Sequence, residues 1–267
     1  MERERAVEKQ IVRLRGDQRE ELTDLVTVEA PVTIYLNSSE LVTLLCTPEK
    51  IDLLALGFLR SEGLIGSIDD LAALRVRQDE GIVEVDLKCE NGLAEKLYGK
   101  RTITSGCGKG SVFFNVLDSL RSSPLEGRLE ISAGKILLLM NSLQEKAELF
   151  KATGGVHSAA LADQEKILFF SEDIGRHNAI DKIVGECLQA GIATDDKIIV
   201  SSGRLSSEIL LKAAKLKVQL LISRAAPTSL CVELAEHLNI TLAGFVRGRR
   251  INIYSHRWRV SGGTGEA

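Results

Sequence analysis

Residues 197–223 read KIIVSSGRLSSEILLKAAKLKVQLLIS and place a strand, a helix and another strand in close succession. The runs Lys197–Ser201 and Leu220–Ser223 are short and apolar, which is typical of strands inside a covered sheet. Between them, Ser206–Leu216 carries apolar side chains at the spacing of one helix face. Strands that alternate with amphipathic helices predict a layered α/β fold.

The same alternation continues on both sides of this stretch. One helix carries Ile180, Ile183, Val184, Cys187 and Leu188 at the i, i+3, i+4, i+7 and i+8 positions of a single face. Short apolar runs that suit strands lie before and after the helical patterns. The further elements expected in this half are helices at 132–150 and 227–238 and strands at 158–161, 167–171, 241–246 and 250–254.

The first half of the chain is expected to form a smaller, mixed α+β unit. Strand-like runs occupy Leu25–Glu29, Val32–Leu36, Leu41–Cys46 and Ile82–Leu87. The tripeptide Thr47-Pro48-Glu49 predicts the start of a helix that ends near residue 62. A hydroxyl caps such a start, proline suits the first turn, and an acid suits the positive end of the helix dipole.

The border between the two halves is predicted at residues 122–127, SSPLEG, the strongest cluster of turn residues in mid-chain. This gives an N-terminal domain of residues 1–125, which carries the Cys107 loop. A C-terminal α/β domain follows over residues 126–260, and residues 261–267 are expected to form a flexible tail.

The composition is that of an ordinary globular protein of 267 residues, with 44% hydrophobic and 27% charged residues. The charge-dense start lacks the apolar core of a signal peptide, and apolar runs such as Ile136–Met140 are too short to span a bilayer. We therefore expect a cytoplasmic protein without a membrane partner. The net charge of −3 gives no overall sign of nucleic-acid binding.

One of the five cysteines has an unusual setting. No two cysteines form a C-x-x-C pair, so reduced thiols are expected. Cys107 lies in TSGCGKG, residues 104–110, where the glycines leave the thiol uncrowded and Lys109 adds a positive charge that favours the thiolate. The same pattern also fits a tight turn that contains a cysteine by chance. Small core side chains are expected for the others, which are Cys46, Cys89, Cys187 and Cys231.

Polar residues gather where the predicted strands end and the helices begin. In open α/β sheets the ligand crevice lies outside the carboxyl ends of the strands, and helix N-termini there favour an anion. Several of these loops carry arginine, whose guanidinium group suits phosphate oxygens. Each loop alone also fits a helix cap or a solvated charged turn. The loops are GGVHS at 154–158, EDIGRHN at 172–178, SSGR at 201–204, SRAAPT at 223–228 and FVRGRR at 245–250.

The chain contains, in this order, TSGCGKG, GGVHS, EDIGRHNAIDK, SGRLSSE, SRAAPT and GFVRGRRINIY. With these segments it resembles the FdhD family, the formate dehydrogenase accessory sulfurtransferases, from about Val28 to Tyr254. The resemblance implies a sulfur carrier that accepts sulfur from a cysteine desulfurase as a cysteine persulfide. The sulfur then passes to the molybdenum cofactor, a molybdenum bis(molybdopterin guanine dinucleotide), before this cofactor enters formate dehydrogenase. The resemblance also implies a homodimer and a C-terminal three-layer α/β/α domain of the cytidine-deaminase-like fold.

The resemblance implies two functional sites. Cys107 is the expected persulfide carrier and the residue responsible for sulfurtransferase activity. A second site is expected to bind a phosphate or guanine end of the cofactor, for which GDP serves as a surrogate, and no resident metal is expected. In this second site, His177 either transfers a proton or hydrogen-bonds the ligand. The residues expected there are Phe245, Val246, Arg247, Gly248, Arg249, Arg250, Arg204, Arg224 and His177.

One position departs from the family pattern. Many members carry two cysteines in C-x-x-C spacing in this loop, and here Gly110 occupies the second position. A disulfide within the loop therefore cannot form, although one reactive thiolate is enough to accept and donate sulfur. Cys89 is a possible second thiol, but nothing in the sequence places it near Cys107.

Two other functions remain as alternatives. A zinc-dependent deaminase needs a His-x-Glu segment and a Pro-Cys-x-x-Cys segment, whereas this chain has His157-Ser158-Ala159 and no paired cysteines. The other alternative is a chaperone that binds a guanine-containing molybdenum cofactor without chemistry. It predicts that Cys107 is dispensable.

Overall fold

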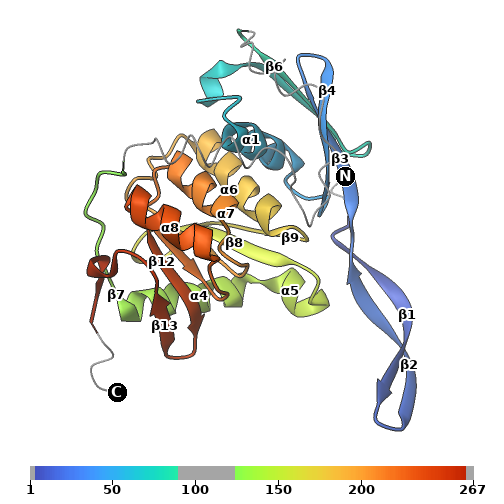
Figure 1. The fold of residues 1–267 in the computed structure, drawn as a ribbon. Coiled ribbons are helices and arrows are strands. Elements are labelled where there is room, and N and C mark those ends of the chain that lie inside the picture. Colours follow the sequence, from blue (N-terminus) through green and yellow to red (C-terminus); the bar gives the residue numbers. More distant parts are fainter. Residues whose placement is uncertain (1–3, 90–123, 263–267) are drawn as a thin grey trace.

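The computed structural model describes residues 4–89 and 124–262. Its larger part is built on a six-stranded sheet (Figure 1) with the strand order β13-β12-β11-β10-β8-β9. Strands β10, β11 and β12 run parallel to one another, whereas β8 is antiparallel to both β10 and β9, and β13 is antiparallel to β12. The strands are β8 His157–Ala162, β9 Ile167–Asp173, β10 Ile198–Ser201, β11 Leu220–Ser223, β12 Thr241–Arg247 and β13 Arg250–Ile253.

Helices cover both faces of this sheet. Ile198 and Val200 of β10 join an apolar cluster with α4, whereas Ile199 joins a second cluster with α6, α7 and α8. Because both faces are covered, the strands are apolar at nearly every position, which explains the continuous apolar runs in the sequence. The helices are α4 Ala133–Lys146, α6 Arg176–Ala190, α7 Ser207–Lys215 and α8 Ser229–Leu238, and the short strands β7 Ile131–Ser132 and β14 Val260–Ser261 pair beside them.

A smaller four-stranded sheet with the order β4-β3-β6-β5 forms the N-terminal part. Its core includes Val32, Ile34 and Val83 of the sheet and Leu54 of helix α1, all of which are fully buried. The elements are β3 Ala30–Leu36, β4 Ser39–Cys46, α1 Ile51–Glu62, β5 Leu71–Arg77 and β6 Ile82–Leu87, with a short 3-10 helix at Ile68–Asp70.

Helix α1 crosses α6 at backbone contact distance. A Cβ atom on Gly57 would lie 1.7 Å from the backbone oxygen of Asp181, and one on Gly185 would lie 2.0 Å from the backbone oxygen of Leu53. Neither position has room for any side chain. The two glycines therefore let the N-terminal helix pack directly on the helix that covers the larger sheet.

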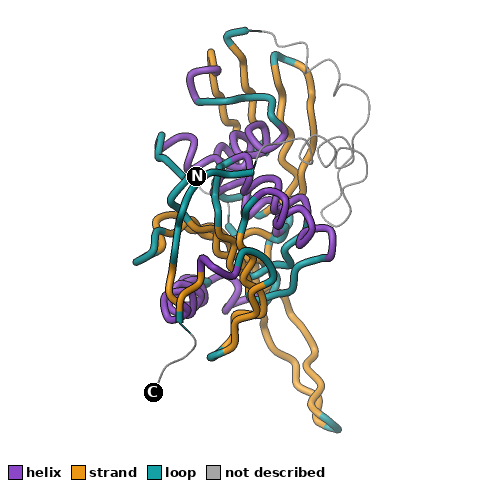
Figure 2. The backbone as a smooth tube through the Cα atoms, turned by 60° about the vertical axis from the view of Figure 1, so that its left-hand side comes forward, coloured by secondary structure: helices purple, strands orange, loops and turns teal. Residues whose placement is uncertain are grey.

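The first two strands form a hairpin that projects away from both sheets (Figures 1 and 2). Strands β1 (Ala6–Arg15) and β2 (Gln18–Thr27) pair antiparallel along their whole length. Most of the hairpin side chains are exposed to solvent, and Leu14 has an exposed fraction of 70%. The base of β2 contacts helix α5 (Glu148–Thr153).

The structure confirms the predicted mixture of helices and strands. Predicted and observed bounds differ by about one residue across the stretch of 197–223, where β10, α7 and β11 are found. The division at residue 125 stays a prediction. Most of the predicted tail lies outside the described residues.

Several local details differ from the predictions. Thr47 does not cap α1, because its side chain is buried against β9 and the helix begins at Ile51 after Lys50 in a left-handed conformation. The helix predicted over 132–150 is divided at Ala147 into α4 and α5. The strand predicted over 25–29 is right only for residues 25–27, which end the longer strand β2, whereas Val28 and Glu29 form the corner before β3. Strands β1 and β5 are not among the predicted elements, and β1 carries the charged residues Glu8, Lys9, Arg13 and Arg15.

Among the residues that the structure describes, no helix is long and apolar enough to cross a membrane.

Candidate functional site

A cavity of about 690 Å³ opens where the parallel strands of the six-stranded sheet end. The loops after β9, β10 and β11 contribute Ile174, Ser202 and Arg224, and the end of β12 contributes Arg247. His157, at the start of the antiparallel strand β8, lies in the same wall. Helices α4 and α5 form the opposite wall, so the cavity lies at the edge where the sequence predicts a ligand.

Arg224 and Arg247 are brought together at this cavity. The Nε atom of Arg247 donates a hydrogen bond to the backbone oxygen of Arg224 at 2.9 Å. This bond fixes the Arg247 side chain beside the Arg224 loop, and both residues line the cavity. Two guanidinium groups at one wall favour an anionic ligand.

The other residues of the predicted basic turn lie differently. Phe245 has a φ of 52° in a bulge of β12, and its ring lies under the guanidinium groups of Arg247 and Arg250, at 5.8 and 4.7 Å. Val246 is fully buried in the core, so its side chain faces away from any ligand. Arg249 is exposed at the β12–β13 turn, next to Gly248 with its φ of 56°. Of this turn, Arg247 lines the cavity.

Basic side chains from two further loops surround His157. Burial lowers the pKa of His157 below its usual value of 6.5, and the charges of Arg176, His177 and Arg204 lower it further, against an opposing effect of Asp173. Gly203 allows this crowding, since a Cβ atom there would lie 2.9 Å from Cβ of Arg176 and 3.6 Å from Nδ1 of His157. Arg176 also begins α6, where the helix dipole adds positive potential.

His177 points to another helix. Its Nε2 atom lies 2.7 Å from Oε2 of Glu208 in the first turn of α7. This contact with His177 lowers the pKa of Glu208 below its usual value. The geometry therefore shows His177 tying α6 to α7, and His177 is not among the cavity-lining residues.

Hydrogen bonds among serines lock the loops at the strand ends. The backbone N–H of Ser158 donates to Oγ of Ser202 at 2.9 Å, and Ser202 N–H donates back to the oxygen of Ser158. The hydroxyl of Ser223 donates to the oxygen of Gly203 at 2.6 Å. The cavity wall is thus preorganised before any ligand binds, which lowers the entropic cost of binding.

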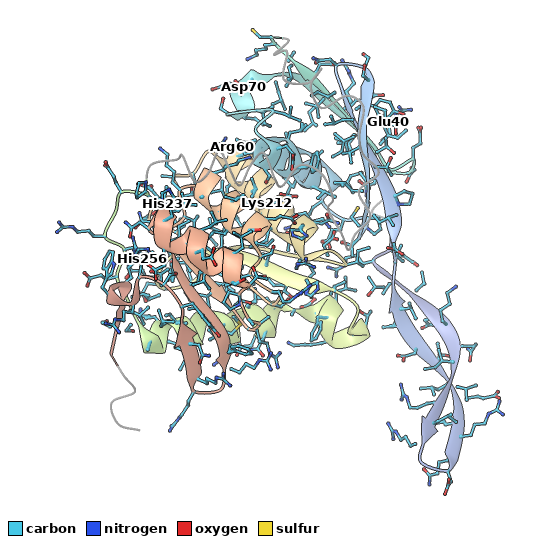
Figure 3. All side chains as sticks on the ribbon, in the orientation of Figure 1. Glu40, Arg60, Asp70, Lys212, His237 and His256 are labelled. Carbon is cyan, nitrogen blue, oxygen red and sulfur yellow. The ribbon has the colours of Figure 1, made fainter. Side chains whose placement is uncertain are left out.

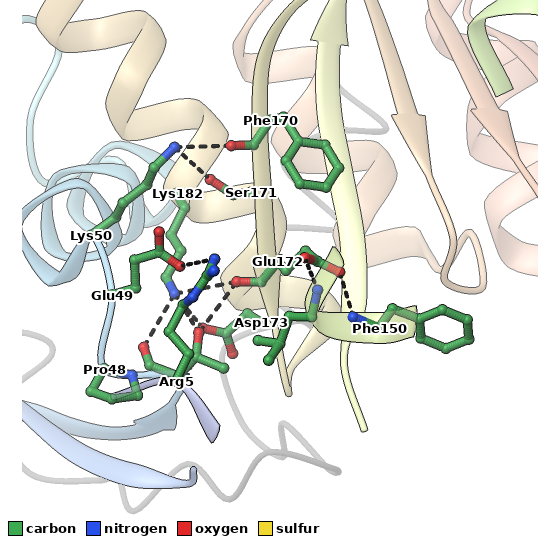
Figure 4. Close-up of polar contacts among 12 residues, drawn as sticks. Arg5, Pro48, Glu49, Lys50, Phe150, Phe170, Ser171, Glu172, Asp173 and Lys182 are labelled. Atoms are coloured by element: carbon green, nitrogen blue, oxygen red, sulfur yellow. Dashed lines mark hydrogen bonds and ion pairs between the residues drawn. The ribbon is translucent and has the colours of Figure 1, made fainter. Parts of the chain in front are cut away.

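The acidic residues of EDIGRHN are used in the interior, not at the cavity (Figure 4). The Glu172 carboxylate accepts hydrogen bonds from the backbone N–H groups of Leu149 and Phe150 at 2.9 and 3.0 Å. Asp173 is fully buried and pairs with Lys182 at 2.7 Å. This part of the segment holds elements together, and neither Glu172 nor Asp173 is among the residues that line the cavity.

His157 is expected to titrate below 6.5 in an NMR titration of its imidazole protons. Its lowered pKa means that the folded state binds this proton less tightly than the unfolded state. The contribution of neutral His157 to the stability of the fold is therefore fully present above pH 6.5 and is lost as the pH falls through the lowered pKa. Arg176→Gln should raise the pKa, whereas Arg19→Gln on the distant hairpin should leave it unchanged. A wild-type value at or above 6.5 would contradict this electrostatic account.

The other two histidines lie away from the cavity. His237 is in the last turn of α8, and His256 follows β13 (Figure 3). His256 Nε2 lies 3.2 Å from the backbone oxygen of Ala235. Within residues 4–89 and 124–262, no group of three histidine, cysteine, aspartate or glutamate side chains could hold a metal ion.

The predicted sulfur carrier, Cys107, and its neighbour Lys109 lie outside the described residues. Cys46, Cys187 and Cys231 are buried as predicted, and burial raises the pKa of the Cys187 and Cys231 thiols to about 12. Cys89 is exposed, so its prediction as a core residue is wrong. Cys89 lies two residues beyond Leu87, the last residue of β6, and therefore outside the small sheet.

The model of the FdhD/NarQ family matches residues 27–261. The chain belongs to this family. Its hairpin precedes the matched region almost entirely, whereas both sheets and the cavity lie within it.

Relatives of known name are similar over nearly the whole chain. The sulfur carrier protein FdhD of Bacillus subtilis (strain 168) is 47% identical over 237 residues, which cover 89% of this chain and 90% of that protein. The protein of the same name from Geobacillus kaustophilus (strain HTA426) is 41% identical over 250 residues, covering 94% and 95%.

A solved structure supports the fold. It is the crystal structure of a protein from Desulfotalea psychrophila, provisionally named a formate dehydrogenase accessory protein. It superimposes with a TM-score of 0.78 over 96% of this chain and 99% of that chain, at 24% identity.

The cavity residues that sequence reasoning missed include Ile174, Ser202 and His157. All three occur in loops that the sequence marks as polar strand ends, and His157 stands in GGVHS. The signal was therefore present at the level of the loop. Which side chain of each loop turns inward depends on contacts such as that of Gly203 with Arg176, which periodicity does not reveal.

Proposed function

We propose that this chain is a sulfur carrier for formate dehydrogenase. It accepts sulfur from a cysteine desulfurase as a persulfide on Cys107 and transfers it to a molybdenum bis(molybdopterin guanine dinucleotide) before that cofactor is inserted. The observation that carries this proposal is the arginine-lined cavity within a chain whose relatives are named sulfur carrier proteins.

The cavity suits one nucleotide end of such a cofactor. Its volume of about 690 Å³ is in the range of small-molecule sites. Arg224 and Arg247 offer charge-assisted hydrogen bonds to a pyrophosphate, while Arg176 and Arg204 add positive potential from the side of His157. The apolar wall, which includes Met140 and Phe150, suits the flat face of a base.

The first chemical step requires only Cys107. Its thiolate attacks the outer sulfur of the desulfurase persulfide, a new S–S bond forms, and the desulfurase cysteine leaves as a thiolate. Lys109 and the flanking amides favour the ionised form of Cys107. The sequence of the loop supports this role.

The remaining expectations from the family resemblance belong to the same proposal. We infer a cytidine-deaminase-like arrangement for residues 126–260, supported by a sheet with helices on both faces. A homodimer and a cytoplasmic location complete the proposal. The cavity alone also suits a cofactor chaperone that transfers no sulfur, and the Cys107 variant separates the two functions.

Arg247→Ala is expected to weaken GDP binding by roughly tenfold or more, since one charge-assisted hydrogen bond contributes about 1.5–3 kcal/mol. The sequence alone predicts the same loss for Arg250→Ala, whereas the position of the Arg250 guanidinium over the Phe245 ring predicts a smaller, indirect loss. Titration calorimetry measures both.

Arg249→Ala is the matched control, because Arg249 belongs to the same turn and is exposed. It removes the same charge and should leave the affinity nearly unchanged. Equal losses in the Arg247 and Arg249 variants would mean that the turn acts only through its net charge. Unchanged affinity in all three variants would remove the turn from the site.

A further inference from the structure

Helix α5 is held at its start by a side chain from the six-stranded sheet. Glu172, at the end of β9, is 4% exposed and accepts hydrogen bonds from the N–H groups of Leu149 and Phe150. These N–H groups belong to the first turn, which has no cap of its own because Ala147 precedes the helix. Glu172 therefore fixes where α5 begins (Figure 4).

The end of α5 is held by the N-terminal part of the chain. The hydroxyl of Thr27, the last residue of β2, donates to Oγ1 of Thr153 at 2.7 Å. Thr153 in turn donates to the oxygen of Leu149 and accepts from the N–H of Gly155. A Cβ atom on Gly155 would lie 2.7 Å from the Thr27 hydroxyl, so the glycine is needed for this contact.

The neighbour of Glu172 makes a second link to the N-terminal part. Asp173 accepts hydrogen bonds from the N–H and the hydroxyl of Thr47, at 3.1 and 3.0 Å, and pairs with Lys182. Adjacent residues of one strand point to opposite sides of the sheet. One acidic residue of β9 thus binds α5, and the next binds the segment between β4 and α1.

Helix α5 is also a wall of the cavity. Phe150 and Lys151 line it, as do Gly154 and Gly155 directly after the helix. Phe150 and Lys151 lie between the Glu172 contact and the Thr27 contact, and the two glycines directly follow Thr153, which makes the Thr27 contact. A shift of α5 at either end therefore changes the shape of the cavity.

We propose that α5 couples the cavity to the N-terminal part of the chain, with Thr27 and Glu172 as its positioning residues. A ligand that fits the cavity stabilises the seated position of α5 and, through it, the contact with β2. The reverse also holds, because coupling between two sites is reciprocal. The identity of the ligand rests on the proposed function, whereas the coupling rests on the contacts alone.

The test compares Thr27→Val with Thr23→Val. Valine keeps the shape of Thr27 and removes the hydroxyl that binds Thr153. Thr23 lies on the same strand and accepts a hydrogen bond from Gln10, away from α5. Thr27→Ser restores the hydroxyl and should restore the behaviour of the wild type.

Two measurements on the full chain are needed. Hydrogen exchange is measured without ligand, each time at the segment opposite the substitution. In Glu172→Gln it is followed at residues 20–28, and in Thr27→Val it is followed at residues 148–156. We expect faster exchange in both cases and no change in Thr23→Val. Calorimetry with GDP is expected to show affinity at least about fivefold weaker in Thr27→Val and Glu172→Gln, the lower range of typical couplings.

The outcomes separate the two proposals. Unchanged exchange at residues 20–28 in Glu172→Gln, a variant of the far end of α5, would overturn the coupling. Failure of GDP to bind the wild-type protein would overturn the proposed ligand, and the exchange measurement would still decide the coupling. Equal GDP affinity in Thr27→Val and Thr23→Val would show that the Thr27 contact does not act on the cavity.

Discussion

Replacing Cys107 with alanine is expected to abolish both persulfide loading and maturation of formate dehydrogenase, with the fold intact. Cys107 is the cysteine whose neighbours favour a thiolate, and Cys46, Cys187 and Cys231 are buried. Burial raises the pKa of the Cys187 and Cys231 thiols to about 12, so these two are protonated at neutral pH. Loading is measured with a cysteine desulfurase and cysteine, and maturation by formate dehydrogenase activity in cells that lack the wild-type protein.

Cys89→Ala is the necessary control, because Cys89 is the exposed cysteine of the described residues. It should load and support maturation like the wild type. Maturation by the Cys107 variant would favour the cofactor chaperone. Loss of loading and maturation in the Cys89 variant alone would mean that Cys89, after the end of β6, is the sulfur carrier.

Asp173→Asn is expected to cost about 3–5 kcal/mol in the free energy of unfolding, the range for breaking a buried ion pair from one side. Asp173 and Lys182 have side chains that are 0% and 1% exposed. Both oxygens of Asp173 accept from donors only: Oδ2 from Lys182 and Thr47, and Oδ1 from Gly175 and Asn178. An amide NH₂ group meets a donor in either orientation, and Lys182 loses its counter-charge.

Denaturant unfolding measures this cost, with Asp86→Asn as a control. Asp86 pairs with Arg75 at 2.8 Å, but their side chains are 31% and 59% exposed. Loss of this pair should cost at most about 1 kcal/mol. Asp173→Asn combined with Lys182→Met removes both charges and should recover part of the loss. Equal small effects at both aspartates would contradict the role of the buried pair.

The elements that the sequence predicted best are those whose own pattern determines them. The strands β10 and β11 are buried on both faces and are apolar except for their last residues, Ser201 and Ser223, whose hydroxyl groups are hydrogen-bonded. Helix α7 needs one apolar side, and its stripe is visible from the sequence alone. For such elements, local pattern and tertiary environment agree.

The errors occurred where a distant contact decides the structure. Thr47 has the local features of a helix cap, but Asp173 and Lys182 bind it more than a hundred residues away in sequence. The segment EDIGRHN lies at a strand end as predicted, yet Glu172 and Asp173 face inward to hold α5 and the N-terminal part. A sequence motif at a strand end therefore predicts the place of a site better than the role of each side chain.

The site was predicted in the same uneven way. Arg224 and Arg247 lie together as expected for two loops at one sheet edge, and they line the cavity. Val246 is in the core, and His177 binds Glu208. Alternation along β12 buries Val246 and exposes Arg247, a consequence of strand geometry that the run FVRGRR hides.

Intact-mass spectrometry of the protein after incubation with a cysteine desulfurase and cysteine tests the central claim most directly. The account predicts a mass increase of one sulfur atom per chain, removed by a reducing agent and located by peptide mapping on the fragment that contains Cys107. An adduct on Cys89 instead, or a protein that stays unmodified while the desulfurase turns over, would contradict it.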